Sequence, residues 1–113
     1  MEDKSEIMQG TLDLMVLKTL EAMGPLHGYG IARRIEQVSA EALLVNQGTI
    51  YLCLMRLVQK RWIRTAWGTS ENNRKAKFYS ITTAGRKQLA AEAKNWERVS
   101  GVIGRLLQLS PRS

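Results

Sequence analysis

The sequence predicts a mostly helical fold with a small β-ribbon. Before residue 61, three stretches carry apolar residues at helical spacing. Two short segments rich in aromatic and β-branched residues follow, separated by a polar turn. A long amphipathic pattern then begins at residue 83 and reaches about residue 107. No linker divides the 113 residues, so we expect one compact unit made of a domain at 7–82 and a terminal helix at 83–109.

Glycine and proline bound the first two helices. The first is predicted at 7–23, with apolar residues near helical spacing at Ile7, Leu12, Met15, Val16, Leu20 and Met23. Gly24-Pro25 ends it, because glycine caps helices and proline cannot continue them. Gly28-Tyr29-Gly30 opens a short second helix. Its inner side is predicted to carry Ile31, Ile35 and Val38, and its outer side Arg33, Arg34 and Glu36.

The third helix is predicted from about Gly48 to Lys60, with inward residues at Ile50, Leu54, Leu57 and Val58. Strands are predicted at 62–67 and 77–81, with a polar loop at 68–75. Thr82-Thr83 offers an N-cap for the final helix. Three helices and a ribbon predict a winged helix-turn-helix. In that fold the third helix enters the major groove of DNA and the ribbon, or wing, lies along the backbone.

Positive charge is concentrated in the same part of the chain. The net charge is +7, but residues 56–87 contain nine basic residues and one acidic residue, Glu71, and carry +8. A polyanion is the natural partner for such a block, and with the predicted winged helix the expected partner is double-stranded DNA. The alternative is an ordinary solvated basic surface.

Four short motifs stand in a characteristic order along the chain. They are Gly10-Thr11-Leu12-Asp13-Leu14, Pro25-Leu26-His27-Gly28-Tyr29-Gly30-Ile31, Gly48-Thr49-Ile50-Tyr51 and Tyr79-Ser80-Ile81-Thr82-Thr83-Ala84-Gly85. Together they resemble PadR-type transcriptional regulators over roughly residues 8–107. The single C-terminal helix resembles the smaller subfamily. The resemblance implies a dimeric winged-helix repressor, commonly released by a small aromatic or phenolic effector.

Two positions beside the third helix depart from the family pattern. Leu52 stands where proline usually follows the motif tyrosine, and Arg61 stands where glycine usually closes the helix. Arginine in a left-handed turn costs about 1 kcal/mol, so we expect a turn of different shape. Both departures put the family's operator sequence in question for this chain.

The start of the third helix carries the candidate base-reading residues Asn46, Gln47 and Thr49. Asn and Gln can bond adenine in a bidentate way, and Thr suits phosphate or a thymine methyl group. Helix capping is the alternative, which leaves Asn46 undecided and favours DNA contact for the other two. Tyr51 resembles the family's phosphate-contacting tyrosine, with half-buried packing as the alternative. Arg56 is expected on the polar side of the helix, either contacting phosphate or solvated.

The predicted wing tip carries a cation cluster of Arg74, Lys75 and Lys77, beside a turn formed by Asn72 and Asn73. Such a cluster is suited to phosphates or to the minor groove, and each neutralised phosphate steepens the salt dependence of binding by roughly one unit. An ordinary charged hairpin is the alternative.

The final helix carries an apolar seam at Leu89, Trp96, Val99, Ile103 and Leu106. This heptad-like repeat extends beyond what a three-helix core can cover, so we expect a homodimer on a pseudo-palindromic operator. The resemblance implies that Trp96 contacts a small planar aromatic effector, and packing between protomers is the alternative. Its candidate neighbours are Met8, Met15 and Val99.

Enzymatic, metal and cofactor functions are not expected. The single histidine, His27, lies in a turn, and the single cysteine, Cys53, is expected to pack as a small apolar group. One cysteine permits no internal disulfide, which suits the cytoplasm. No apolar run approaches the ~20 residues that cross a bilayer, and the polar residues 1–6 do not resemble a signal peptide. The alternatives to a sequence-specific regulator are non-specific DNA binding and a protein-interaction module.

Overall fold

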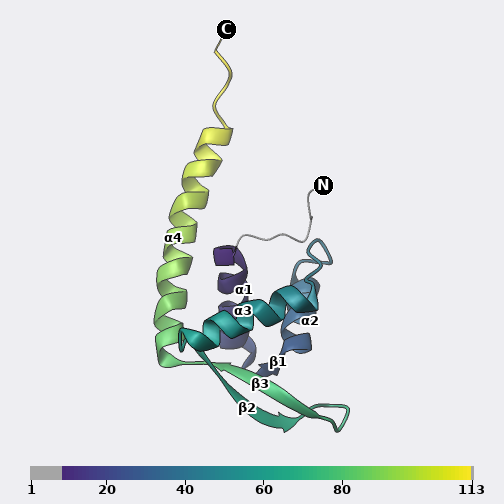
Figure 1. Ribbon diagram of the computed structural model, residues 1–113. Coiled ribbons are helices and arrows are strands. Elements are labelled where there is room, and N and C mark those ends of the chain that lie inside the picture. Colours follow the sequence, from purple (N-terminus) through teal and green to yellow (C-terminus); the bar gives the residue numbers. More distant parts are fainter. Residues whose placement is uncertain (1–8, 113) are drawn as a thin grey trace.

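The computed structural model describes residues 9–112 and has the predicted fold class, mostly helical with a small antiparallel sheet (Figure 1). Helices α1 (Gln9–Met23), α2 (Gly28–Val38) and α3 (Gln47–Gln59) form a compact group. Strands β1 (Leu26–His27), β2 (Ile63–Thr69) and β3 (Lys75–Ile81) lie below these helices in this view. Helix α4 (Thr83–Leu107) rises along one side and extends past them. Residues 7 and 8 of the predicted first helix lie outside the described residues.

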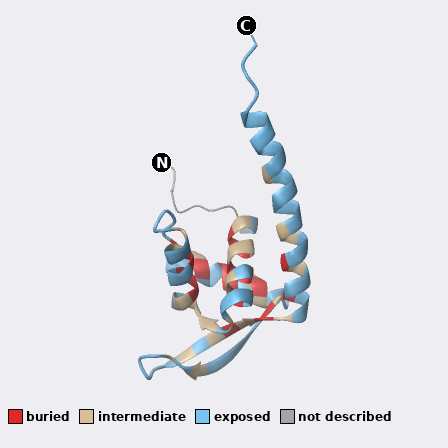
Figure 2. Ribbon diagram, turned by 180° about the vertical axis from the view of Figure 1, so that it is seen from behind, coloured by how far each residue is buried: buried red, intermediate tan, exposed pale blue. Residues whose placement is uncertain are grey.

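The hydrophobic core lies where α1, α2 and α3 meet the base of the sheet, as the red segments of Figure 2 show. Its largest fully buried side chains include Leu17, Leu20, Ile31, Ile50, Leu54 and Leu57. Most of them occupy predicted inward positions, because those positions repeat at helical spacing. In the described part of α4, no residue beyond Leu89 is buried. The outer part of α4 therefore does not belong to this core.

Two positions of α2 correct the prediction. Val38, expected on the inner side, is 73% exposed, because α2 ends there and the chain turns away through Ala40 and Glu41, both with positive φ. Glu36, expected outside, is half-buried. Its carboxylate accepts a hydrogen bond of 3.1 Å from the backbone N–H of Val45. Glu36 thereby anchors the loop that leads into α3.

The sheet has three strands in the order β1-β3-β2, not the predicted two. β1 pairs with β3 through two residues only, which is too short a segment to leave a pattern in the sequence. β2 and β3 also extend further than predicted, since Thr69 pairs with Lys75. The predicted loop at 68–75 therefore shrinks to 70–74. The exposed polar residues of this ribbon resemble a loop in sequence, although their backbone is paired.

The tip of the wing is a tight turn closed by Asn73. The Ser70 N–H donates to the Arg74 carbonyl (2.8 Å), and the Asn73 N–H donates to the Ser70 carbonyl (2.9 Å). Asn73 has a φ of 59°, a left-handed conformation that asparagine tolerates better than most residues. The predicted turn at Asn72 and Asn73 is confirmed, and Arg74 follows it directly, immediately before β3 begins at Lys75.

The turn between α3 and β2 fixes where the wing lies relative to α3. Arg61 has a φ of 63° and donates its N–H to the Val58 carbonyl (2.9 Å). Trp62 donates its N–H to the Leu57 carbonyl (3.0 Å). These two bonds form a Schellman cap, which is usually built on glycine. The expectation of a turn of different shape is therefore wrong, since Arg61 takes the conformation that glycine would take.

Helix α4 begins on this same turn. Thr82 is its N-cap and accepts a hydrogen bond from the Gly85 N–H (3.0 Å). The Thr82 hydroxyl donates to the Arg61 carbonyl (2.8 Å), and the Thr82 N–H donates to the Trp62 carbonyl (3.0 Å). A Cβ at Gly85 would overlap the carbonyl oxygen of Trp62. The predicted cap at Thr82-Thr83 is confirmed, and it joins the base of α4 to the end of α3.

Candidate nucleic-acid interface

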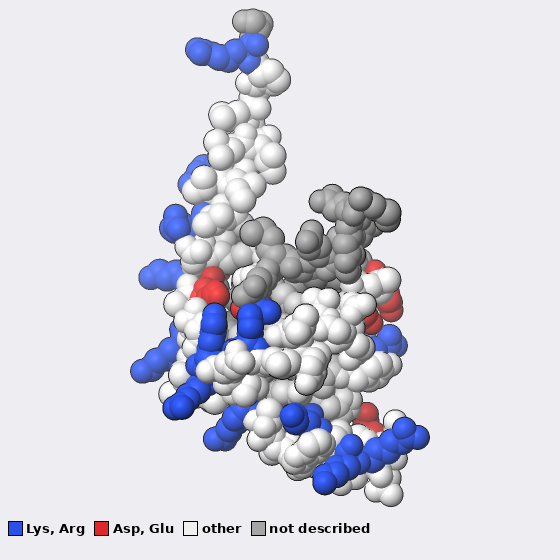
Figure 3. Space-filling view, viewed as in Figure 1, with Lys and Arg blue, Asp and Glu red and all other residues white. Residues whose placement is uncertain are grey.

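An open groove of about 520 Å³ lies between the start of α3 and the wing. Gln47 and Tyr51 line it on the helix side, and Arg74, Lys75 and Lys77 line it on the wing side. All five side chains are exposed. Figure 3 shows lysine and arginine gathered at the wing tip, at the lower right of the view. Five residues predicted to contact DNA therefore share one concave, positively charged surface.

The start of α3 resolves the role left open for Asn46. Its side-chain oxygen accepts hydrogen bonds from the backbone N–H groups of Gly48 (2.7 Å) and Thr49 (3.3 Å). Asn46 is therefore the N-cap of α3, which confirms the capping alternative. Gln47, the next residue, has an exposed side chain that lines the groove, whereas Thr49 is half-buried and does not line it.

Two tyrosines lie near the base of the groove. Tyr51 is 57% exposed and Tyr79 is buried, and both line the groove. Burial raises the pKa of the Tyr79 hydroxyl, and the neighbouring Tyr51 raises it further. The exposed side chain of Tyr51 is available to a ligand, whereas that of Tyr79 is buried.

Arg56 has a partner within the protein. Its guanidinium donates a hydrogen bond of 2.6 Å to the carboxylate of Asp13, a buried residue of α1. The expected position on the polar side of α3 is therefore wrong, because the arginine turns toward α1. The two residues of this ion pair are 43 positions apart in the sequence. The guanidinium that was predicted to contact phosphate is therefore bonded to Asp13 instead.

Cys53 completes this buried cluster. The thiol donates a hydrogen bond of 3.1 Å to the same carboxylate oxygen of Asp13. Burial raises the pKa of the Cys53 thiol far above its ordinary value, and the hydrogen bond to Asp13 and its charge raise it further. The expected burial of Cys53 is confirmed. The thiol stays protonated and acts as a hydrogen-bond donor between α3 and α1.

Trp67 is a residue of the wing that the sequence analysis did not select. It is 64% exposed and lies directly opposite Lys77 in the ribbon, so the two side chains share a face. The ammonium groups of Lys75 and Lys77 lie 5.2 Å and 5.7 Å from the centre of a Trp67 ring. An aromatic residue in a predicted wing strand could have pointed to this site. Whether Trp67 shares a face with Lys75 and Lys77 depends on the strand register, which the sequence does not show.

His27 has a structural role. Its ring nitrogen Nδ1 accepts a hydrogen bond of 3.0 Å from the Gly30 N–H, so it caps α2. Its ring also packs edge-on against Phe78, with ring centres 5.5 Å apart.

Within the described residues, no group of three or more His, Cys, Asp or Glu side chains could hold a metal ion. None of the described helices is both long enough and apolar enough to cross a membrane.

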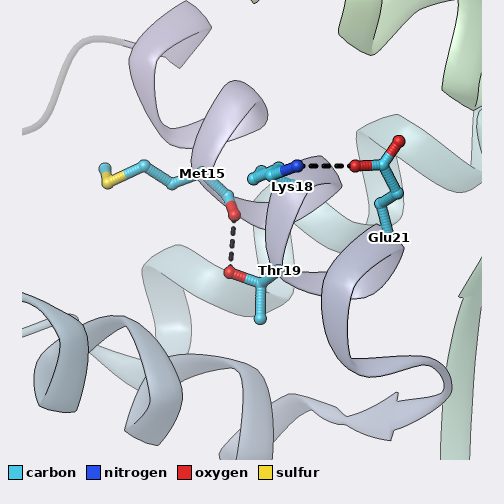
Figure 4. A network of polar contacts seen from close by, with 4 residues as sticks. All are labelled: Met15, Lys18, Thr19 and Glu21. Atoms are coloured by element: carbon cyan, nitrogen blue, oxygen red, sulfur yellow. Dashed lines mark hydrogen bonds and ion pairs between the residues drawn. The ribbon is translucent and has the colours of Figure 1, made fainter.

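A second cavity, of about 560 Å³, lies between α1, α2 and α4 and is lined mostly by apolar residues. Met15 and Trp96, both predicted to contact an effector, line it from α1 and α4. The wall on α1 is shown in Figure 4, where the side chain of Met15 points away from the Lys18–Glu21 ion pair (2.8 Å). The Thr19 hydroxyl donates to the Met15 carbonyl (2.7 Å). Met8 lies outside the described residues.

The seam residues of α4 are exposed along its outer part. Trp96, Val99, Ile103 and Leu106 are 54%, 39%, 49% and 58% exposed. Only Trp96 among them also lines the second cavity. In the isolated chain this apolar strip therefore has solvent over much of its surface.

The chain is similar to known transcriptional regulators. Residues 16–91 match the family described as "Transcriptional regulator PadR-like family". The chain is 28% identical over 100 residues to "Uncharacterized protein X" from Lysinibacillus sphaericus, which covers 88% of this chain and 91% of that protein. It superposes on a transcriptional regulator from Clostridium thermocellum with a TM-score of 0.80 and 26% identity, covering 88% of this chain and 96% of that one. A PadR-like transcriptional regulator from Bacillus cereus gives a TM-score of 0.77 and 26% identity, covering 90% and 96%.

Proposed function

Because the chain belongs to the PadR-like family, whose members are DNA-binding transcriptional regulators and not enzymes, we propose that it is a sequence-specific repressor. In this proposal a homodimer binds a pseudo-palindromic operator in the cytoplasm, and a small planar aromatic effector releases it. DNA-binding regulation follows from the family itself. The repressor role, the dimer and the effector are the parts that we propose.

The groove between α3 and the wing is the observation that carries this proposal. One wall presents the amide of Gln47 and the phenol of Tyr51, and the other presents three cations and one carboxylate, Glu71. An amide can distinguish base edges, whereas cations bind phosphates of any sequence. A surface with both kinds of group side by side is suited to hold a duplex and to read it.

The helix-capping role of Asn46 narrows the set of base-reading residues. Its side-chain oxygen accepts hydrogen bonds from two backbone N–H groups, so we assign base reading to Gln47. Thr49 is half-buried and does not line the groove, so its predicted DNA contact is not part of this proposal. Tyr51 and the wing cations Arg74, Lys75 and Lys77 contact the backbone in this proposal, and Asn73 shapes the wing tip. Arg56 is left out, because Asp13 holds its guanidinium.

A binding titration tests the operator proposal. The protein is titrated against a labelled duplex enriched by the protein itself from a random-sequence library, and against a scrambled duplex of the same composition. We expect a preference for the enriched duplex that survives near-physiological salt, because base contacts depend on salt less than phosphate contacts do. Equal binding to both duplexes, lost as salt rises, would support the non-specific alternative. Binding to neither duplex would support a protein-interaction module.

The cavity between α1, α2 and α4 supports the effector proposal. It is apolar, it has room for a small aromatic molecule, and Trp96 lines it. A planar aromatic ligand stacked on Trp96 should quench its fluorescence and lower operator affinity in the same concentration range. The matched control is Trp96→Phe. This variant lacks the Trp96 fluorescence, so the effect of the ligand on it is measured by operator affinity alone. Quenching without any change in operator affinity would contradict the effector role.

A further inference from the structure

The outward face of α3 carries no charge. Its exposed residues are Gln47, Gly48, Tyr51, Leu52, Met55 and Gln59. The one arginine of this helix is turned toward α1 and bonded to Asp13. A helix with this face enters a DNA groove with amide, phenol and apolar groups only.

Leu52 and Met55 form the apolar centre of that face. Leu52 is 61% exposed and Met55 is 44% exposed. They lie three residues apart, so their side chains are neighbours on the helix surface. Gly48, one turn before Leu52, has no side chain and leaves this part of the helix open to close approach. The result is a neutral, apolar strip along the part of α3 that faces away from the core.

We propose that Leu52 and Met55 recognise thymine through its C5-methyl group in the major groove. The inference rests on the proposed function and adds the base that α3 selects. The thymine methyl is the apolar group that base edges present in the major groove. Packing leucine against it removes apolar surface from water on both partners.

Charge favours DNA over an apolar protein partner as the occupant of this strip. Tyr51 lines the groove that holds Arg74, Lys75 and Lys77, and a smaller pocket beside it is lined by Tyr51, Met55 and Lys77. Those cations hold a phosphate backbone on the wing side, which brings the adjacent strip to the base edges. A protein partner would instead meet an apolar strip beside the three cations of the wing tip.

Thymine-to-deoxyuridine substitution tests the inference directly. In the enriched duplex, each thymine is replaced in turn by deoxyuridine, which pairs with adenine in the same way but lacks the methyl group. For the unmodified protein we expect about fourfold weaker binding at one or two positions in each half-site, the effect of losing one buried methyl contact. Leu52→Ala or Met55→Ala should bind the thymine and deoxyuridine duplexes equally at the position that the residue reads. Both side chains are exposed, so both variants should melt at the temperature of the unmodified protein.

Lys77→Ala is the matched control. It should weaken binding to both duplexes and keep their ratio, because phosphate contacts do not sense the methyl group. Preference for the enriched duplex with no deoxyuridine effect at any position would overturn the inference and leave the proposed function standing. The same holds if both alanine variants retain the deoxyuridine effect. Absence of any sequence preference would overturn the proposed function and this inference together.

Discussion

Arg61 holds a backbone conformation that glycine adopts at lower energy. Its φ of 63° places its Cβ near the following carbonyl group. We predict that Arg61→Gly raises the free energy of unfolding by about 1 kcal/mol, measured by urea denaturation. The control is Lys60→Gly at the adjacent position, where φ is −82°. There glycine adds backbone freedom to the unfolded chain and removes the contact of the Lys60 ammonium with the Trp62 ring (4.7 Å), so that variant should lose at least roughly 0.5–1 kcal/mol. Equal effects at both positions would contradict the assigned strain.

Asp13 carries the contact between α1 and α3. Asp13→Ala leaves the half-buried guanidinium of Arg56 and the Cys53 thiol without their acceptor. We predict a loss of up to about 3 kcal/mol in the free energy of unfolding, since the charge of Arg56 remains partly buried without its partner. Chemical denaturation followed by circular dichroism measures this loss.

Glu21→Ala provides the matched control for Asp13, because it also removes a carboxylate from an ion pair of α1. The Lys18–Glu21 pair lies at the surface, and such pairs contribute at most about 1 kcal/mol. A loss at Asp13 no larger than the loss at Glu21 would show that the buried pair does not hold α3 in place.

The wing should contribute to the affinity for every DNA duplex, whatever its sequence, because its cations contact phosphates. Replacing Arg74, Lys75 and Lys77 with alanine removes the three cations that line the groove from β3 and its turn. We predict weaker binding to enriched and scrambled duplexes, with a salt slope lower by about 2 to 3 units. Binding at several salt concentrations measures the slope. Lys94→Ala, which removes an exposed cation from α4, should leave it unchanged. An unchanged salt slope in the triple variant would show that the phosphates bind to another surface of the protein.

The elements could be predicted to different extents because different forces define them. The helices α1, α3 and α4 could be predicted from the sequence, since apolar residues repeat at helical spacing along each of them. β1 depends on its partner strand and has no pattern of its own. The paired backbone near the wing tip has the sequence of a loop, because both faces of that ribbon are exposed and its residues need not alternate.

The residues of the candidate site could also be predicted to different extents. The wing cations could be predicted because the positions of arginine and lysine are read directly from the sequence. The partner of Arg56 could not, because it lies 43 residues away and depends on how α3 packs against α1. The face of Trp67 depends on the strand register, which the turn at Asn73 sets.

At the scale of the whole molecule, the outer part of α4 should determine the oligomeric state. Ile103 is 49% exposed in the middle of the apolar seam. We predict that Ile103→Glu converts the proposed dimer into a monomer, because a buried carboxylate at the seam would lack a partner. Sedimentation equilibrium measures the mass, and affinity for the palindromic duplex should fall with it.

Arg105→Glu introduces the same side chain on the other side of α4, two residues along. That variant should remain a dimer, because the new carboxylate stays in solvent. If Ile103→Glu also stays dimeric, the protomers associate through another surface.

The hydrogen bonds of Thr82 to the turn after α3 connect the base of α4 to the end of α3, so in the proposed dimer the length of α4 should affect the spacing of the DNA half-sites. In the proposed dimer, the seam on α4 and the reading face of α3 are connected through that turn. Each residue added to a helix rotates the remainder of that helix by about 100° and advances it by about 1.5 Å. One residue inserted between Leu89 and Trp96 would therefore turn the two reading helices out of phase with each other. Seven would restore the phase to within about 20° and place each reading helix about 10 Å farther from the seam. In the proposed dimer, the number of residues between Leu89 and Trp96 therefore sets the distance and relative orientation of the two reading helices, and with them the spacing of the DNA half-sites.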